Sequence, residues 1–374
     1  MGYSRNEVVH PRHYAALDLG TNNCRLMIAR RTAQGIHVFD RQNRMVCLGE
    51  GLVETGELGA PAMERTLRTL HSYAERLHGL PGLELRAVAT EACRRARNSA
   101  AFLSRVRRET GLELEIISPR EEVELAVEGC RPLLRGGQGP VRRAIVFDIG
   151  GGSTEIAWLR LNPANETHEV VSLVSLPFGV VTLAEISART RHDDSGRGGD
   201  ATTGRSSFES MVTMVQEPLH AFEAVHQIGK EIRNGSVQML GTSGTVTTLA
   251  SIAQRLTRYS RHAVDGFTLS ADSAHKAVEA IRHAHDTGAP SPVGLSQERR
   301  HFMLPGCAIF EAIHRVWPVD SLIVADRGLR DGMVARMAAH ARDPWQRRHA
   351  PSRKPRLERR AADSRGHATH SSSM

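Results

Sequence analysis

Aromatic side chains are scarce in this chain of 374 residues, where Phe, Trp and Tyr together make up 4%. The hydrophobic fraction is 40%, so the chain can bury a sizeable core that aliphatic side chains must largely fill. Lysine is also rare, with three residues against 46 arginines, a bias that we attribute to a GC-rich genome rather than to function. The length predicts two domains.

Paired cysteines and long apolar runs are lacking as well. The five cysteines are scattered and form no C-x-x-C pair, which argues against a disulfide framework or a zinc site and favours reduced thiols in a cytosol. No run approaches the roughly 20 apolar residues that a membrane span needs, and the first residues lack the apolar stretch of a signal peptide. We therefore expect a cytoplasmic protein with no membrane partner.

The formal net charge of +8 is unevenly distributed along the chain. From Arg342 onward nine basic residues stand against three acidic ones, so this tail carries +6 and the rest of the chain only +2. We expect residues 1–12 to be flexible and residues 343–374 to form a basic disordered tail. Apart from Trp345, the tail has no aromatic residue that could stack on bases, which argues against nucleic acid as a partner.

Apolar runs and helical spacings alternate along the rest of the chain, which is typical of an α/β architecture. The opening pattern returns once, because the residues from Ala144 (AIVFDIG) repeat those from Tyr14 (YAALDLG) 130 residues later. We predict duplicated domains, 13–138 and 139–342, whose matching turns face each other across a cleft. Residues 190–206, polar and rich in Gly, Ser and Thr, are predicted to be a disordered insertion in the second domain.

Both of the repeated turns favour an anion. In the first, Gly20 permits a tight bend, and Thr21 and Asn22 add side-chain donors, although an ordinary hairpin turn explains this motif equally well. The second carries three consecutive glycines between two strands, where a glycine run usually marks close approach of another group. Asp148 and Glu155 flank it with hard oxygen ligands that suit Mg²⁺. At the second turn we favour a phosphate and metal site over a flexible linker.

A third motif, in the segment ISPREEV, contains a pair of glutamates at a helix start. Ser118 suits the N-cap, Pro119 the first helical position and Glu121 the third, so a capping box accounts for Glu121. Glu122 beside it is free to face the cleft, where a carboxylate could take a proton from an attacking water. Spacing alone favours a structural role for Glu122.

Two further segments have a functional and a structural interpretation. In the segment GTSGTVTT, Gly244 and Thr245 lie where a strand leads into a helix N-terminus, which either binds phosphate or is simply capped by Ser243. Three arginines, Arg94 among them, cluster after the strand predicted at residues 83–90. Arginine grips phosphate through its planar fork, but such a run is usually a solvated helix face.

Taken together, these segments resemble the exopolyphosphatase and guanosine pentaphosphate phosphatase (Ppx/GppA) family. The resemblance covers about residues 13–340, and the matching stretches follow the family's order: ALDLGTNNCRLMIA, AVATEACRRARN, IISPREEVELA, VFDIGGGSTEIAW, SLPFGVVTL, MLGTSGTVTTLA and VADRGLRDGMV. It implies an actin-like fold of two ribonuclease-H-like domains with an interdomain cleft. The implied activity is that of an exopolyphosphatase, which removes the terminal phosphate from inorganic polyphosphate.

The resemblance also implies roles for single residues. Glu122 matches the family's catalytic base, Asp148 and Glu155 match the carboxylates that hold Mg²⁺ or Mn²⁺, and Arg94 matches an arginine that contacts phosphate. Two positions depart from the family pattern, since Pro119 replaces a usual glycine and Glu124 an arginine. Together with Gly20, the phosphate-binding loops match at Thr21, Asn22, Gly150, Gly151, Gly152, Ser153, Gly179, Gly244 and Thr245.

Three alternatives remain open at this stage. Cleavage of pppGpp to ppGpp is a second activity within the family, and no single residue separates the two substrates. An actin-like kinase or ATPase shares the paired turns, and a non-catalytic polyanion binder would use the arginine-rich tail. The sequence leaves the oligomeric state open, with a homodimer as one option.

Overall fold

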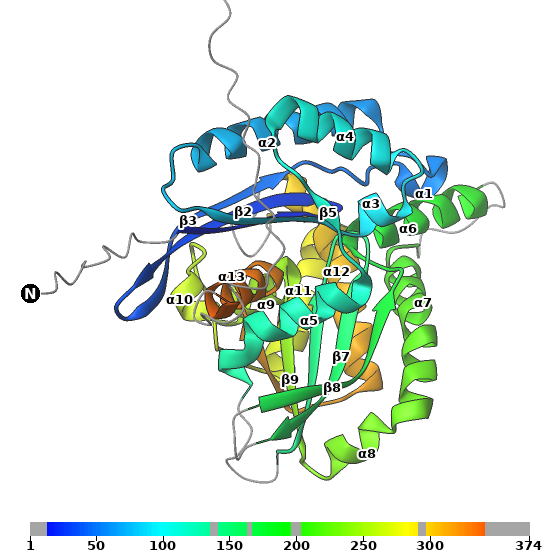
Figure 1. Ribbon diagram of the computed structural model, residues 1–374. Helices are drawn as coiled ribbons and strands as arrows, with labels where there is room; N and C mark the ends of the chain where they lie inside the picture. The colour runs from blue at the N-terminus through cyan, green and yellow to red at the C-terminus, as the bar shows by residue number, and fades with distance from the viewer. Residues whose placement is uncertain (1–12, 135–140, 163–166, 196–202, 291–296, 341–374) are drawn as a thin grey trace, which may run out of the picture.

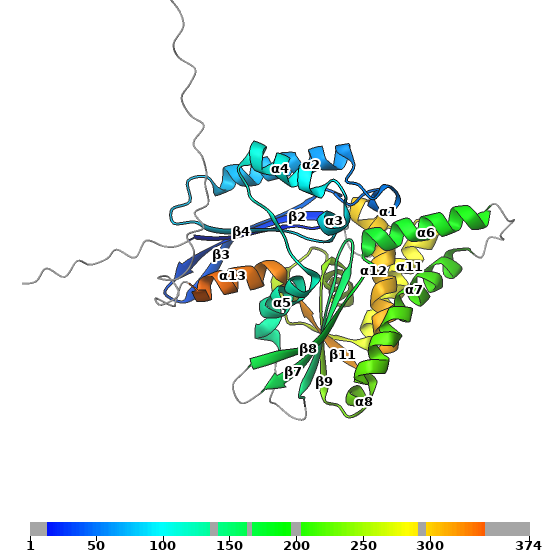
Figure 2. The same cartoon turned by 45° about the vertical axis from the view of Figure 1, so that its right-hand side comes forward.

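A computed structural model of the chain describes residues 13–134, 141–162, 167–195, 203–290 and 297–340. These residues form two β-sheets, and two helices, α5 (Pro119–Cys130) and α13 (Leu329–His340), lie between them (Figure 1). Figure 2 shows further helices on the far side of each sheet, so both sheets are covered on both faces.

The elements of the first half precede and include α5. They are β1 (His13–Leu19), β2 (Asn23–Thr32), β3 (Gly35–Met45), α1 (Leu52–Thr55), α2 (Ala60–Leu77), β4 (Glu84–Ala89), α3 (Glu91–Arg95), α4 (Ser99–Thr110), β5 (Glu115–Ile116) and α5. The second half begins with a short 3₁₀ helix. Its elements are η1 (Arg131–Leu133), β6 (Arg143–Ile149), β7 (Thr154–Asn162), β8 (Thr167–Leu176), α6 (Val180–Ser195), α7 (Thr203–His226), α8 (Ile228–Arg233), β9 (Val237–Thr242), α9 (Gly244–Ala253), α10 (Arg261–Val264), β10 (Thr268–Ser270), α11 (Ala271–Thr287), α12 (Gln297–Val316), β11 (Ser321–Ala325) and α13.

The two sheets repeat one topology. The first has the order β3-β2-β1-β4-β5, and the second has the order β8-β7-β6-β9-β11 with β10 added at its outer edge. In the first sheet β1 to β3 form an antiparallel meander and β4 and β5 run parallel to β1. In the second, β6 to β8 form the meander and β9 and β11 run parallel to β6. This repetition confirms the predicted duplicated, actin-like α/β fold.

The first strand of each half is apolar on both faces because both faces of its sheet are covered. In β1, Leu17 packs towards α2 and α4, whereas Tyr14 packs against α13. In β6, Phe147 packs with α12, and Val146 packs towards α5. These two continuous apolar runs therefore fix the strands whose ends carry the polar turns.

Two glycines allow α5 and α13 to approach each other closely. A Cβ on Gly129 of α5 would overlap the carbonyl oxygen of Gly328 just before α13. A Cβ on Gly332 of α13 would likewise overlap the carbonyl oxygen of Leu125. The backbones of the two central helices are thus in contact, with the C-terminal part of α5 against the N-terminal end of α13.

We expect the substitution Gly129→Ala to lower the free energy of unfolding by about 1–3 kcal/mol, the usual cost of forcing an extra carbon into a packed site. Helix propensity alone would raise it, because alanine in a helix interior is about 1 kcal/mol more favourable than glycine. Thermal unfolding, with Glu128→Ala on the same helix as a control, separates the two effects. A melting temperature that is unchanged or raised in Gly129→Ala would contradict the close contact.

The prediction of a disordered insertion at residues 190–206 is wrong at both ends. Residues 190–195 belong to α6 and residues 203–206 begin α7, while residues 196–202 lie outside the described part. The polar composition indicated disorder, but α7 is fixed further along, where Phe208 and Val212 are buried in the core of the second half. A helix that is nucleated by such packing can extend into polar sequence, because each added residue costs little.

Other predicted segments lie outside the described residues, namely residues 1–12, the tail at 343–374 and the boundary near residue 138. The packing does not follow chain order at this boundary. The helix α5 of the first half packs on the second sheet, and α13 of the second half packs on the first sheet. Within the described ranges, no helix has the length and apolar content needed to cross a bilayer.

Candidate active site

The two glycine-bearing turns meet at the carboxyl ends of β1 and β6. In each turn the N–H of the first glycine, Gly20 or Gly150, donates to the carbonyl oxygen three residues later at 2.9 Å. The turns are also in contact, since a Cβ on Gly151 would lie 3.0 Å from the backbone nitrogen of Asn22. Any side chain at position 151 would therefore press against the opposite turn, and the two turns form one site.

Thr21 is buried where the two turns touch. A Cβ on Gly152 would overlap the hydroxyl oxygen of Thr21, which shows how closely they pack. This hydroxyl has no hydrogen-bond partner among the described residues although Thr21 is only 4% exposed. Because an unsatisfied buried hydroxyl is costly, its position at the joint suits a ligand oxygen. Its neighbour Asn22 is anchored to the end of β3, where its carbonyl oxygen accepts from Val46 at 2.9 Å.

Gly179 supports the second turn from behind. A Cβ on Gly179 would overlap the backbone of Gly151, so only glycine allows the start of α6 to approach this closely. The N–H of Val181 donates to the carbonyl oxygen of Gly151 at 2.8 Å, and the hydroxyl of Thr182 donates to that of Gly152 at 3.1 Å. These bonds hold the carbonyl groups away from the cleft and leave its opposite side to backbone N–H groups.

The turn before α9 lies beside the site, because Thr242 at the end of β9 pairs with Asp148 of β6. The hydroxyl of Ser243 accepts from the N–H of Val246 at 3.3 Å, so the predicted structural cap is present. Gly244 has open space around its Cα, whereas the side chain of Thr245 packs against α12. Only the backbone of Gly244 and Thr245 is thus placed to face a ligand.

Two carboxylates stand side by side next to the second turn. Asp148 on β6 is directly opposite Glu155 on β7, and opposite residues of an antiparallel pair project to the same face of the sheet. Oε1 of Glu155 accepts from the hydroxyls of Ser153 at 2.6 Å and Ser175 at 2.9 Å. These two bonds orient the carboxylate, so that Ser153 acts here through Glu155.

Burial raises the pKa of both carboxyl groups, Asp148 and Glu155. It raises the pKa of Asp148 to about 6. The positive charge of Arg25 opposes this shift, and the negative charge of Asp18 adds to it. Burial also raises the pKa of Glu155 to about 7, with the hydrogen bond from Ser153 opposing and the charge of Asp148 adding to the shift. Two adjacent carboxyl groups that are costly to ionise point to a site completed by a cation.

Glu122 reaches the same place from the first turn of α5. Its Oε2 accepts from Nη1 of Arg94 at 2.7 Å, and Arg94 is held in turn by Glu91 at 2.9 Å and by the carbonyl oxygen of Ile117 at 3.0 Å. Burial, and next the charge of Glu155, raise the pKa of Glu122 well above its usual range, against the opposing charge of Arg94. The predicted contact of Arg94 with phosphate stays a prediction, because its guanidinium is engaged by two glutamates.

The N-cap of α5, the helix that positions Glu122, is as predicted. The hydroxyl of Ser118 accepts from the N–H of Glu121 at 3.2 Å, and Pro119 occupies the first helical position. The carboxylate of Glu121, however, pairs with Arg86. Glu121 therefore faces away from the cleft, and the neighbouring Glu122 is the glutamate that enters it.

A sequence model of the Ppx/GppA phosphatase family matches residues 27–341. The chain belongs to this family. A crystal structure of the Aquifex aeolicus member of the family is similar, with 25% identity over 89% of this chain and 100% of that chain and a TM-score of 0.67. An exopolyphosphatase-like protein is similar at 26% identity over 88% of this chain and 99% of that one, with a TM-score of 0.71. An exopolyphosphatase from Cytophaga hutchinsonii shares the fold at 20% identity, with coverages of 88% and 98% and a TM-score of 0.68.

In this Ppx/GppA phosphatase, the donor set at the second turn fits a hard divalent cation. Among the described residues, no three His, Cys, Asp or Glu side chains gather closely enough to hold a metal unaided. Mg²⁺ is commonly bound by one or two carboxylates together with water and substrate phosphates, so Asp148 and Glu155 are suitable ligands for it.

The raised pKa values predict how the metal-free phosphatase responds to pH. The folded state keeps the Glu155 proton up to about pH 7, whereas a glutamate in the unfolded chain loses it near 4.5. The free energy of unfolding should therefore fall as the pH rises between those values. With a chelator present, the melting temperature of Glu155→Gln should rise relative to that of the unmodified protein from pH 5 to pH 8. If the difference in melting temperature between the two proteins is the same at every pH, the raised pKa of Glu155 is contradicted.

Three charged residues of the site were not among the sequence candidates. Asp18 at the end of β1 is the counterpart of Asp148, and its position in the repeat could have identified it. Arg25 lies opposite Asp18 on β2, with Nη1 3.8 Å from Oδ2. Arg330 comes from the first turn of α13, and no local pattern connects it with a strand more than 300 residues earlier.

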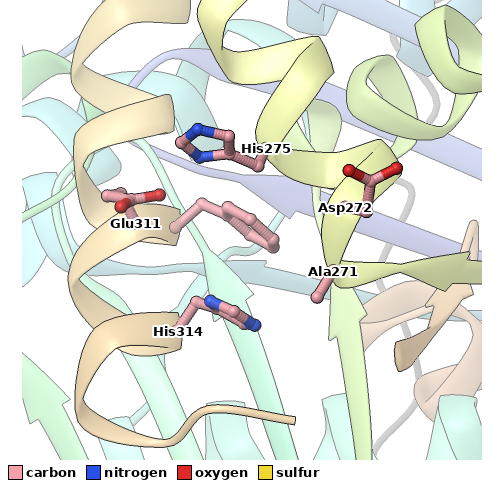
Figure 3. Close-up of a pocket in the computed structure, with 6 residues that line it drawn as sticks. Ala271, Asp272, His275, Glu311 and His314 are labelled. Carbon is pink, nitrogen blue, oxygen red and sulfur yellow. The ribbon is translucent and has the colours of Figure 1, made fainter. Parts of the chain in front are cut away.

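A hollow of about 300 Å³ between α11 and α12 lies elsewhere (Figure 3). It adjoins the start of β11, whereas the turns of the site lie where strands end. The carboxylates of Asp272 and Glu311 each pair with a basic residue one helical turn later, at 2.7 and 2.8 Å. A ring nitrogen of His314 lies 3.1 Å from the carbonyl oxygen of Val319. These groups are engaged by their own surroundings, and the hollow is separate from the chemistry described above.

Proposed function

We propose that this phosphatase is a cytoplasmic, metal-dependent exopolyphosphatase that hydrolyses the terminal phosphate of inorganic polyphosphate. One observation carries the proposal: Glu122 lies within electrostatic reach of Glu155, which stands opposite Asp148 next to the two touching glycine turns. Among the described residues, no hydrogen bond engages the N–H groups of Gly151 and Gly152. A chain end with several phosphate oxygens fits such backbone donors better than an uncharged ester does.

Glu122 is proposed to act as the general base. Burial and the charge of Glu155 raise its pKa, which makes this carboxylate a stronger base than an exposed glutamate. Arg94 positions Glu122, since Glu91 and the carbonyl oxygen of Ile117 prevent its guanidinium from moving. Glu122 then orients a water molecule for in-line attack on the terminal phosphorus and accepts its proton.

The turns are proposed to hold the terminal phosphoryl group during the attack. The N–H groups of Gly151 and Gly152 and the hydroxyl of Thr21 would donate to its equatorial oxygens, where charge is spread in the transition state. Asp148 and Glu155 would hold Mg²⁺ or Mn²⁺, which when bound supplies positive charge to the phosphate oxygens. Exclusion of bulk water by the packed turns strengthens each of these interactions.

The same terminal group occurs in pppGpp, so its hydrolysis to ppGpp is the alternative activity. Phosphate release should be measured side by side with long polyphosphate, tripolyphosphate and pppGpp at fixed free Mg²⁺. Our proposal predicts the highest kcat/KM for long polyphosphate and no release in the presence of excess chelator. Release from pppGpp alone would assign the alternative, and release from none of the three would overturn the proposal.

A further inference from the structure

The duplication places charges of opposite sign at corresponding positions of the two halves. The residue opposite the strand-end aspartate is Glu155 in the second half and Arg25 in the first. The central helices also differ, because the first turn of α5 carries Glu121 and Glu122, whereas that of α13 carries Arg330 together with Asp331. The side of the cleft formed by the second sheet and α5 therefore presents carboxylates for a metal and a base, and the side formed by the first sheet and α13 presents Arg25 and Arg330 beside Asp18.

Arg330 is held at this place by the packing of α13 on the first sheet. Leu329 and Met333 on the same helix are buried against Tyr14 and Ala16 of β1. Just before the helix, Gly328 lies close to the catalytic strand, since a Cβ on it would be 3.9 Å from Oδ2 of Asp148. The start of α13 thus adjoins the carboxylate site directly.

Arg330 is half-buried, and no side-chain partner in the described part of the chain holds its guanidinium in place. Among the described residues, no hydrogen bond or ion pair within normal distance reaches it. Burial lowers the pKa of Arg330 to about 10, and the like charge of Arg25 adds to this, while Asp18 and Asp331 oppose it. Two arginines beside one another repel each other, and an anion between them would relieve the repulsion.

We propose that Arg330 binds the phosphates of the leaving chain, next to the bond that is cut. The proposal rests on the proposed function. In an in-line displacement the attacking oxygen and the leaving oxygen lie on opposite sides of phosphorus. Glu122 on α5 places the water on the side of the second sheet, so the leaving oxygen points to the side of the first sheet and α13, which contains Arg330. The forked guanidinium suits two oxygens of the penultimate phosphate.

Calorimetric binding of tripolyphosphate and orthophosphate at fixed free Mg²⁺ tests this proposal in a Glu122→Gln background, in which turnover is greatly slowed. Adding Arg330→Gln should weaken tripolyphosphate binding by about 10- to 100-fold, as expected for charged hydrogen bonds. Orthophosphate has no second phosphate, so its affinity should change by less than about threefold. Arg330→Lys keeps the charge but loses the forked guanidinium. Its affinity for tripolyphosphate should lie between those of the Arg330 and Arg330→Gln proteins.

Arg336→Gln provides a matched control, because Arg336 lies on the same helix and its guanidinium faces Glu124, at 3.8 Å. It should leave both affinities unchanged. An equal loss for the two anions with Arg330→Gln would show a structural role, and an unchanged affinity for tripolyphosphate would also overturn the proposal. If the Glu122→Gln protein binds neither anion before Arg330 is changed, the proposed function itself fails, and this inference with it. If Arg330→Gln does not fold, Arg330→Lys decides by the same comparison.

Discussion

Replacing Glu122 by glutamine should lower kcat by about two to four orders of magnitude, as expected when a general base is lost. Glutamine has nearly the same shape, and its side-chain oxygen can still accept from Arg94, but it cannot take a proton from water. The turns and the metal carboxylates are untouched, so KM for polyphosphate should change by less than about threefold. Steady-state phosphate release with polyphosphate at saturating Mg²⁺ measures both quantities.

Glu124→Gln is the matched control for this variant. Glu124 lies on the same helix but pairs with Arg120 at 3.0 Å on the exposed side. Its substitution should leave kcat within about twofold of the unmodified protein. Full turnover by Glu122→Gln would remove the base assignment, and an equal loss in both variants would indicate a general effect of charge on α5.

Replacing Asp148 by asparagine should have opposite effects on activity and on stability. Activity should fall by about three orders of magnitude or more, because the charge stabilisation that a bound cation supplies is worth several kcal/mol. The metal-free protein should nevertheless be more stable at pH 8, since the substitution removes a buried negative charge next to Glu155 and Asp18. Phosphate release and thermal unfolding in a chelator measure the two effects.

Asp272→Asn serves as the control, because Asp272 is exposed and pairs with Lys276 at 2.7 Å on its own helix. It should change neither quantity appreciably. Added Mg²⁺ should raise the melting temperature of the unmodified protein and of Asp272→Asn, but raise that of Asp148→Asn much less. Full activity in Asp148→Asn, or equal stabilisation of all three by Mg²⁺, would contradict the metal assignment.

The parts of the site that the sequence predicts are those built by local pattern. The strand-turn-strand repeat identified Gly20 and Gly150 as equivalent, and antiparallel pairing then places Asp148 opposite Glu155. The N-cap of α5 was likewise recognisable, because it depends on neighbouring residues. Alternation and the internal repeat can be read directly from the sequence, and they were sufficient for the α/β class and the duplicated domains.

The remaining features depend on contacts between distant segments. Spacing could not decide whether Glu122 faces the cleft, since that follows from the ion pair of Arg86 with Glu121 and from the packing of α5 on the second sheet. Arg330 joins the site only because α13 returns to the first sheet. The helical ends of the segment 190–206 were missed because composition reports polarity, whereas helix extent is decided by packing further along the chain.

A crystal structure of the Glu122→Gln protein with Mg²⁺ and tripolyphosphate tests the central claim most directly. The substitution should trap an uncut chain whose bound position can be seen. We predict a terminal phosphate between the turns at Thr21 and Gly151, a cation on Asp148 and Glu155, and the rest of the chain towards Arg330. A chain bound on another surface, with the two turns and their carboxylates making no contact to phosphate or cation, would contradict the account.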